Sequence, residues 1–387
     1  MLRRVRVNES LSRVELARQL HLAPSTAGAY VDRLIEDGFL TERQKATRDH
    51  GRPPTLLSLN PEGGRFIGVD FEAHNIMATV VDFSQTKMRE IHKNIGSADT
   101  VEQIIAKIED AIEDLMNHHK RTVLGIGVGV PGIIDPKSQT ALHYGHIAGW
   151  ENIPLGERLK KRFKVPVYLE NNIRSMALAE LWYGQARDVN NFICLGIRTG
   201  IAAGVVVRRR LVHGRTNFAG EIGEWLCPTA PIERISETEG NGWSCGPLRK
   251  LEEIASVPAL LNMVRAAAVK TRSSSLHGNK GELTIDDVVA AANQGDEAVV
   301  AVLDNIGQTL GWALCQMNKL FNPEKIIIAG SLVALGEHLL MPLRKAAGRL
   351  CSIPQEHAPP VVTSELGPFN GALGAAALAL HEWTPKR

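Results

Sequence analysis

In the first sixty residues, apolar positions recur first at helical spacing and then in two short runs typical of strands. Ser12 followed by Glu15 has the pattern of a capping box, which predicts that a short helix begins there. Pro24 is typical of the first turn of a helix, and Asp37-Gly38 supplies a left-handed end for that helix. Between these ends, apolar residues recur at Ala27, Val31, Leu34 and Ile35. The pattern predicts two short helices joined by a tight turn.

Two apolar runs follow the helices, at 39–42 and 56–59, and a basic loop with two prolines separates them. A helix pair followed by strand, basic loop and strand is the layout of a winged helix-turn-helix. We therefore expect residues 1–62 to form a domain that binds double-stranded operator DNA. The alternative is a small helical domain that binds protein and has a surface loop that is basic by chance.

The second helix and the loop hold the residues that we expect to contact DNA. Ser25 and Thr26 lie in the first helical turn, where they can reach base edges or phosphates. Arg52 stands between glycine and proline, and an arginine on extended backbone suits a narrow minor groove. Arg33 and Tyr30 complete the candidate set. Arg33 fits a DNA contact and a solvated surface equally, and Tyr30, next to core positions, fits packing better than base reading.

The rest of the chain alternates buried strands with helices. Strands are predicted at 66–70, 76–82, 123–130, 165–169, 192–196, 203–207 and 325–330. Helices are predicted at about 101–118, from 170 through 181, and before the last of these strands. Strands and helices that alternate twice over predict an α/β body of two lobes with a cleft between them.

Composition adds little to this picture. The chain has 387 residues, of which 44% are hydrophobic and 22% charged, as in a globular protein of two or three domains. Residues 1–65 hold 11 Lys and Arg against 8 Asp and Glu, a mild excess that fits nucleic-acid contact.

Five widely spaced cysteines predict reduced thiols, as in a cytosolic protein. No apolar run approaches the roughly 20 residues of a membrane span and no signal peptide is evident, so we expect a cytoplasmic protein with no membrane partner.

Seven segments of the body stand in a specific order and spacing. They are GVGVPGIID at 127–135, HIAGWENIPL at 146–155, LENN at 169–172, LGIRTGIAAGVVV at 195–207, GEIGEW at 220–225, WSCGPLRKLE at 243–252 and IIIAGS at 326–331. With them the chain resembles the ROK family (repressor, open reading frame, kinase) over nearly its whole length. The resemblance implies an actin/hexokinase-like (ribonuclease H-like) fold of two α/β lobes, a sugar bound between them, and homodimers or homotetramers. A winged helix-turn-helix in front is the arrangement of the repressor branch.

Kinase chemistry is altered at two places. The family's phosphate-binding pattern Asp-x-Gly-Gly-Thr-Lys is DFEAHN at 70–75 here, and Glu72 would repel a phosphate. The catalytic aspartate of the family is replaced by Asn172, and an amide cannot accept a proton as a general base. The second phosphate loop, at 199–204, is nearer to the kinase form, with Ala202 in place of a glycine. We expect no catalytic residue and no enzyme activity; an active sugar kinase is the alternative that these changes oppose.

The resemblance also implies a sugar site. Asn171 matches the family's sugar-binding asparagine, and Asn172 can still bond a sugar hydroxyl. His146 stands where an asparagine is common in the family.

Carboxylates complete the implied sugar site. Glu221 and Glu252 match glutamates that hold sugar hydroxyls, and the alternative is that both are solvated surface acids. Glu224 replaces a histidine that also reaches the sugar, so it changes which sugar fits or abolishes binding.

The zinc-binding pattern of the family is where this chain departs most. The positions of one histidine and three cysteines are held by Glu224, Trp243, Cys245 and Lys250. A structural zinc takes four ligands of Cys or His type, so we expect no metal and no cofactor, with Trp243 packing to hold the loop. A rearranged site of Cys227, Cys245 and Glu224 is the alternative.

The sequence as a whole predicts a sugar-responsive repressor of carbohydrate-metabolism genes. Residues 1–62 would form the DNA-binding domain, 65–172 with the C-terminal helix 370–387 the first lobe, and 173–369 the second lobe with an oligomerisation surface. Two DNA-binding domains of an oligomer would occupy half-sites, and a sugar or sugar phosphate would shift the lobes. The alternative is a DNA-binding regulator whose body is only a dimerisation scaffold. Repressors of the family commonly have an arginine in the recognition helix where this chain has Ala29. Recognition of DNA bases would therefore depend on Ser25, Thr26 and the wing.

Overall fold

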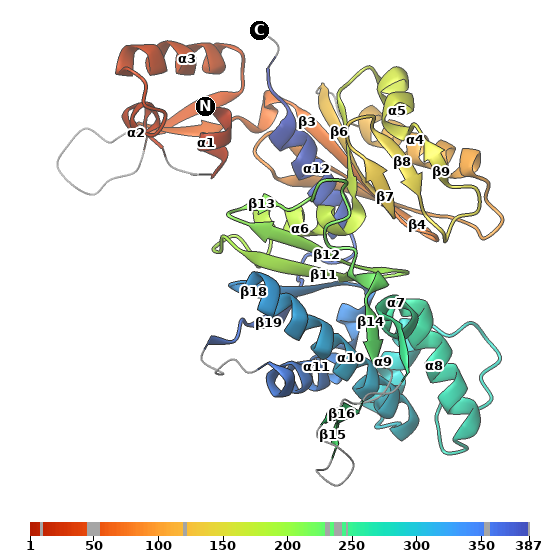
Figure 1. Ribbon diagram of the computed structural model, residues 1–387. Helices are drawn as coiled ribbons and strands as arrows, with labels where there is room; N and C mark the ends of the chain where they lie inside the picture. The colour runs from red at the N-terminus through yellow and green to blue at the C-terminus, as the bar shows by residue number, and fades with distance from the viewer. Residues whose placement is uncertain are drawn as a thin grey trace. The chain divides into compact units, whose positions relative to one another are not determined.

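The computed structural model describes residues 1–7, 11–44, 55–118, 122–228, 233–235, 242–244, 247–351 and 357–385. They divide into two compact units (Figure 1). The first unit comprises Met1–Asn172 and Gly371–Arg387, and the second comprises Ile173–Asn370. Each unit contains one five-stranded sheet.

A small domain of helices and one hairpin opens the first unit. Its elements are α1 (Leu2–Val7), α2 (Arg13–Gln19), α3 (Pro24–Glu36), β1 (Leu40–Gln44), β2 (Thr55–Leu59) and the 3-10 turn η1 (Pro61–Gly63). The predicted capping box is confirmed, because the Ser12 side chain accepts from the Glu15 N–H and the Glu15 side chain accepts from the Ser12 N–H. Gly38 is left-handed at φ 81°, as predicted. Strands β1 and β2 pair antiparallel and confirm the hairpin of a wing, whereas Arg52 and its loop lie outside the described residues.

The main sheet of the first unit has the order β10-β6-β3-β4-β5. Its strands are β3 (Arg65–Phe71), β4 (Asn75–Asp82), β5 (Lys87–Asn94), β6 (Val123–Val130) and β10 (Val167–Asn171). The pairs β10·β6 and β6·β3 are parallel, and β3·β4 and β4·β5 are antiparallel. Helices α4 (Val101–Asn117) and α5 (Leu155–Phe163) and a three-stranded sheet of β7 (Ile133–Asp135), β8 (Thr140–His143) and β9 (Glu151–Ile153) complete this part.

Helix α12 (Asn370–Glu382) returns to the first unit and lies directly on its sheet (Figure 1). A Cβ atom on Gly68 of β3 would lie 1.9 Å from the Ala372 carbonyl oxygen, and one on Gly127 of β6 would lie 1.8 Å from the Ala375 carbonyl oxygen. Only glycine fits at both places, since no real Cβ approaches an oxygen so closely. Two glycines on neighbouring strands therefore form the seat of α12.

The second unit has a sheet of order β13-β12-β11-β18-β19 with helices packed on it. The strands are β11 (Phe192–Ile197), β12 (Ile201–Val207), β13 (Arg210–Leu211), β18 (Lys325–Gly330) and β19 (Val361–Thr363). The helices are α6 (Asn172–Trp182), α7 (Leu251–Ala255), α8 (Val257–Lys270), α9 (Ile285–Asn293), α10 (Glu297–Phe321) and α11 (Glu337–Leu350). Short elements include η2 (Ile222–Glu224), β14 (Leu226–Pro228), β15 (Glu233–Ile235), β16 (Gly242–Ser244), β17 (Leu248–Lys250) and η3 (Ser331–Leu335). The predicted pairing of β11 with β12 around Gly200 is confirmed.

One helix of the described chain, α10, is long and apolar enough to cross a membrane by length and composition. The expectation that no segment reaches that length is therefore wrong. A central helix of a globular core passes the same test, and most of the apolar window of α10 is buried. A Cβ on Gly311 of α10 would lie 2.5 Å from the Leu343 carbonyl oxygen of α11, so the two helices pack closely. The contacts assign α10 to the core of the second unit.

Candidate DNA-binding surface and sugar site

The first turn of α3 presents its polar residues to solvent. Ser25, Thr26 and Ala29 are all exposed, while Ala27 and Val31 on the opposite side are buried in the small domain. Ala23 at the N-cap has no side-chain oxygen to accept from the free N–H groups of this turn. These N–H groups and the two hydroxyls are suited to a phosphate or a base edge.

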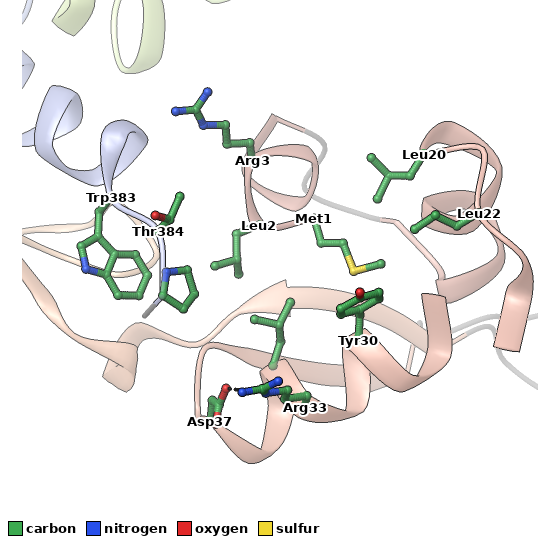
Figure 2. A pocket seen from close by; sticks show the side chains of 12 residues that line it. Met1, Leu2, Arg3, Leu20, Leu22, Tyr30, Arg33, Asp37, Trp383 and Thr384 are labelled. Carbon is green, nitrogen blue, oxygen red and sulfur yellow. Dashed lines mark ion pairs between the residues drawn. The ribbon is translucent and has the colours of Figure 1, made fainter. Parts of the chain in front are cut away.

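Tyr30 and Arg33 lie on a side of α3 that faces α1 and the residues after α12 (Figure 2). They line a cavity of about 630 Å³ together with Leu2 and Trp383, among others. Tyr30 is 55% exposed, so the interpretation that favoured packing in the core for it is wrong. The Arg33 Nε lies 3.9 Å from an Asp37 carboxylate oxygen, and the Arg33 side chain stays 66% exposed. Both residues are accessible to solvent. The sequence alone could not indicate this cavity, because its lining residues come from both ends of the chain.

An ion pair network, missed by sequence reasoning, holds α3 against the rest of the small domain. Arg13 at the start of α2 lies 2.6 Å from an Asp32 carboxylate oxygen of α3 and 2.7 Å from a Glu42 carboxylate oxygen of β1. The hydrogen bond to Glu42 is the main reason why the pKa of Arg13 is raised. One guanidinium therefore ties both helices to the wing hairpin.

The predicted sugar-binding amides lie at the end of β10 in the first unit. The Asn171 side-chain amide donates to the Gly132 carbonyl at 3.0 Å, and the backbone N–H of Asn171 donates to the Glu170 carboxylate at 2.7 Å. Asn172 follows as the first residue of α6 and is buried. Gly132 is left-handed at φ 74°, and a Cβ there would lie 2.2 Å from the His143 carbonyl oxygen. The backbone that orients Asn171 therefore depends on a glycine that the sequence reading did not single out.

His146 belongs to the same unit but is exposed. Its ring centroid lies 5.2 Å from that of Tyr144.

The three candidate glutamates of the second unit lie close together. Gly220, at φ 91°, places Glu221 at the start of η2, and a Cβ on Gly220 would lie 1.9 Å from the Ala203 carbonyl oxygen. Burial raises the pKa of Glu221 to about 7; Arg174 opposes this shift, and Glu252 and Glu224 add to it. A Glu252 carboxylate oxygen lies 3.0 Å from the position of a Cβ on Gly223. The site therefore groups carboxyl oxygens, one of which carries a proton for part of the time at neutral pH.

The former zinc positions hold an ion pair. Lys250 Nζ lies 2.7 Å from a Glu224 carboxylate oxygen, and the hydrogen bond between them raises the pKa of Lys250. Cys227 is buried and burial raises the pKa of its thiol to about 12, so it is a poor thiolate ligand. No group of three or more His, Cys, Asp or Glu suited to a metal occurs within the described ranges, and Cys245 and the Trp243 side chain lie outside them. Of the four former zinc positions, Glu224 and Lys250 therefore bond to each other.

Comparison with known proteins links both parts of the chain to families. The profile of the ROK family matches residues 66–382, and that of a winged helix-turn-helix DNA-binding domain matches residues 1–41. A xylose repressor of Caldicellulosiruptor bescii is 28% identical, over 97% of this chain and 93% of the relative. The DNA-binding transcriptional dual regulator NagC of Escherichia coli is 29% identical, over 95% of this chain and 88% of the relative.

Solved structures agree with these relatives. A ROK family transcriptional regulator, homologous to the E. coli MLC protein, has a TM-score of 0.78 at 25% identity and covers 96% of this chain and 91% of its own. A ROK family glucokinase from Streptomyces griseus, in complex with glucose and AMPPNP, has a TM-score of 0.69 at 27% identity, over 82% of this chain and 100% of its own. Since the family profile spans well over half of the residues, the chain belongs to the ROK family and carries an N-terminal winged helix-turn-helix.

Proposed function

We propose that this protein is a sugar-responsive, DNA-binding transcriptional repressor of carbohydrate-metabolism genes, without kinase activity. The observation that carries the proposal is a winged helix-turn-helix in front of a ROK body whose catalytic position is Asn172. Relatives named as a xylose repressor and as the regulator NagC match nearly the whole chain and support it. Such a regulator acts in the cytoplasm.

The turn between β3 and β4 supports the loss of kinase chemistry. The Glu72 N–H donates to the Asn75 carbonyl at 3.0 Å, which closes the turn tightly. Ala73 is 7% exposed and packs in the hydrophobic core, where a phosphate loop needs open glycines. The Asp70 carboxylate lies 2.4 Å from the position of a Cβ on Gly371, at the positive end of α12. These contacts give Asp70 and Ala73 packing partners, which supports the proposal that this turn no longer binds phosphate.

The DNA partner would be an operator read by α3 and the wing. Ser25 and Thr26 would contact bases or phosphates, Arg33 and Tyr30 the backbone beside them, and Arg52 the minor groove. We propose domains at 1–62, 65–172 with 370–387, and 173–369. Two DNA-binding domains of a homodimer or homotetramer would occupy paired half-sites.

The effector would be a neutral sugar held by amides and carboxylates. Asn171, Asn172 and His146 would contribute from the first unit, and Glu221, Glu224 and Glu252 from the second. A protonated Glu221 can donate to a hydroxyl, and a carboxyl oxygen of Glu252 can accept from one. Grouped carboxylates repel a phosphate, which favours a free sugar over a sugar phosphate. The sugar can alter operator affinity only if it binds the two conformations of the protein with different affinity.

A body that is only a scaffold is the second candidate. The ion pair of Glu224 with Lys250 favours it, because a lysine engages a residue of the implied sugar site. The two candidates differ in whether any sugar stabilises the folded protein.

A thermal-shift screen separates them, with glucose, xylose, N-acetylglucosamine and their phosphates as ligands. A sugar at 100 times its Kd adds about 2.7 kcal/mol of stability, which is easily measured. We expect one free sugar to raise Tm and Glu221→Ala to abolish the rise. Glu253→Ala is the matched control, because Glu253 lies on the same short helix as Glu252 and pairs with Arg249 at the surface.

Two outcomes would contradict the proposal. Operator binding without any sugar-induced shift would favour the scaffold. Sugar-dependent turnover of ATP by the wild-type protein would show a kinase.

A further inference from the structure

Two arginines of α1 hold the last turn of α12. Arg6 Nη1 donates to the Leu380 carbonyl at 2.5 Å, and Arg3 Nε donates to the His381 carbonyl at 3.0 Å. Arg3 also lies 3.5 Å from a Glu382 carboxylate oxygen. The last carbonyl groups of a helix lack partners within the helix and carry its partial negative charge, so guanidinium groups are well matched to them.

Arg6 is buried to an unusual degree for an arginine, with 5% of its surface exposed. Its guanidinium carbon lies 5.2 Å from the ring centroid of Phe83, the residue that follows β4. A charge taken this far out of water requires partners, and they include the Leu380 carbonyl of α12 and the face of the Phe83 ring. The residue connects the DNA-binding domain to the body, although it is not part of the expected DNA surface.

An aromatic cluster forms a second contact between the same parts. Phe39, which precedes β1, stacks on Phe83 with centroids 5.2 Å apart and meets Trp383 edge-on at 5.2 Å. Phe66 of β3 completes the cluster at 6.0 Å from Trp383. Figure 2 shows Leu2 of α1 beside Trp383 and Thr384. The small domain therefore contacts α12 and the residues after it at two places, in addition to its chain connection to β3.

Helix α12 can transmit an orientation because it is itself fixed. Its backbone lies on Gly68 and Gly127 of the sheet, and its first turn lies against Asp70. The winged helix-turn-helix is held on the last turn of α12, so its orientation is fixed relative to the sheet of the first unit. An oligomer that joins its bodies rigidly then holds its DNA-binding domains at a fixed separation and angle.

We propose that Arg6, supported by Arg3, is a positioning residue for operator recognition. It fixes the orientation of the winged helix-turn-helix on α12 and thereby sets the half-site spacing that the oligomer accepts. This inference rests on the proposed DNA-binding function. It assigns to α1 a role separate from base reading.

The test uses the full-length protein and DNA that it selects itself. Wild-type protein is incubated with a random duplex library, and sequencing of the bound fraction gives the half-site and its preferred spacing. Duplexes with the spacing changed by about two base pairs, roughly a fifth of a helical turn, and a duplex with one half-site are then titrated. We expect wild type to lose about tenfold in affinity on the respaced duplexes, and Arg6→Met to lose less than about threefold. Affinity for the single half-site stays unchanged, because Arg6 does not contact DNA.

Three further variants keep the test decisive. Arg4→Met removes the same charge from an exposed position of the same helix and should retain the wild-type spacing dependence. Arg6→Lys should restore part of the spacing dependence, because the ammonium keeps the charge but lacks the planar donor geometry of the guanidinium. Arg3→Met, at a side chain that is 62% exposed, should relax spacing without affecting folding, even if Arg6→Met does not fold.

The outcomes are distinguishable. Unchanged spacing dependence in both Arg6→Met and Arg3→Met would overturn the positioning role while leaving the DNA-binding function intact. A wild-type protein that enriches no sequence from the library would overturn the proposed function itself. An equal loss on single and paired half-sites would also overturn the inference, because it would make Arg6 a DNA contact.

Discussion

The β3–β4 turn of the first unit and the η2 turn of the second unit have kept different parts of the family pattern. In the first, Ala73 is buried in the core and Asp70 lies against the start of α12. In the second, Glu221 keeps a carboxyl group whose burial raises its pKa to about 7, with Glu252 and Glu224 adding to the shift. The first turn packs in the core, whereas the second groups Glu221 with two further glutamates that raise its pKa. The comparison therefore sets a turn packed in the core against a turn that groups carboxyl side chains.

The largest expected effect is on the stability of two matched glycine variants, one in the packed first unit and one near the carboxyl groups of the second. Gly127→Ala places a Cβ 1.8 Å from a backbone oxygen of α12, which cannot move without lifting the helix. We expect a loss of at least about 3 kcal/mol in the free energy of unfolding. At Gly200, near the carboxylate group, the nearest atom to a Cβ is a Glu252 oxygen at 3.7 Å. Gly200→Ala should therefore stay within about 0.5 kcal/mol of wild type.

Urea titration monitored by circular dichroism measures both variants under the same conditions. If the two variants were equally stable, the seat of α12 would be no more tightly packed than the surroundings of Gly200, and the contrast would be lost.

Glu221→Gln tests the carboxylate side. The pKa of Glu221 is raised from 4.5 to about 7 in the folded protein, so its stabilising contribution is full below pH 4.5 and is lost as the pH rises through 7. The shift corresponds to about 3 kcal/mol, and exposure of the site to solvent lowers that figure. We expect the variant to exceed wild type by 1–3 kcal/mol, an order-of-magnitude range, at pH 8 and to approach it at about pH 4.5.

Urea titrations at several pH values between 5 and 8 give the comparison directly. A wild-type protein whose stability does not fall over this range relative to Glu221→Gln would show that the carboxylate group carries no such cost. Glu253→Gln serves as the control, because Glu253 pairs with Arg249 at the surface.

The elements with strong periodicity could be predicted from the sequence, and those formed by tertiary contact could not. Strands such as β6 and β18 are continuous apolar runs and lie where expected. Strand β5, with mostly exposed residues, gave no apolar signal because it lies at a sheet edge. Helix α1 has six residues, half of them arginines, and owes its order to α12 and β2. No local pattern contains those partners.

The candidate site divides in the same way. The resemblance identified Glu221 and Glu252, but only the fold brings them together around η2. The opposite charges of Glu224 and Lys250 at former zinc positions could have suggested their ion pair. Burial of Arg6 could not be read from the sequence, since an arginine in a basic terminal segment normally contacts solvent or nucleic acid.

The smallest expected effect is the response of ATP turnover to Asn172→Asp. This variant returns the family's general base to the start of α6, but a base alone cannot position a phosphoryl group. Glu72 and the buried Ala73 remain in the β3–β4 turn, so we expect ATP turnover with glucose or xylose to stay at background in a coupled assay. Adding Glu72→Gly and Ala73→Gly should destabilise the core of the first unit before it restores a phosphate loop, because Ala73 contributes to that core. Turnover by Asn172→Asp alone would mean that the turn still admits phosphate, and the two regions would then differ less than their packing indicates.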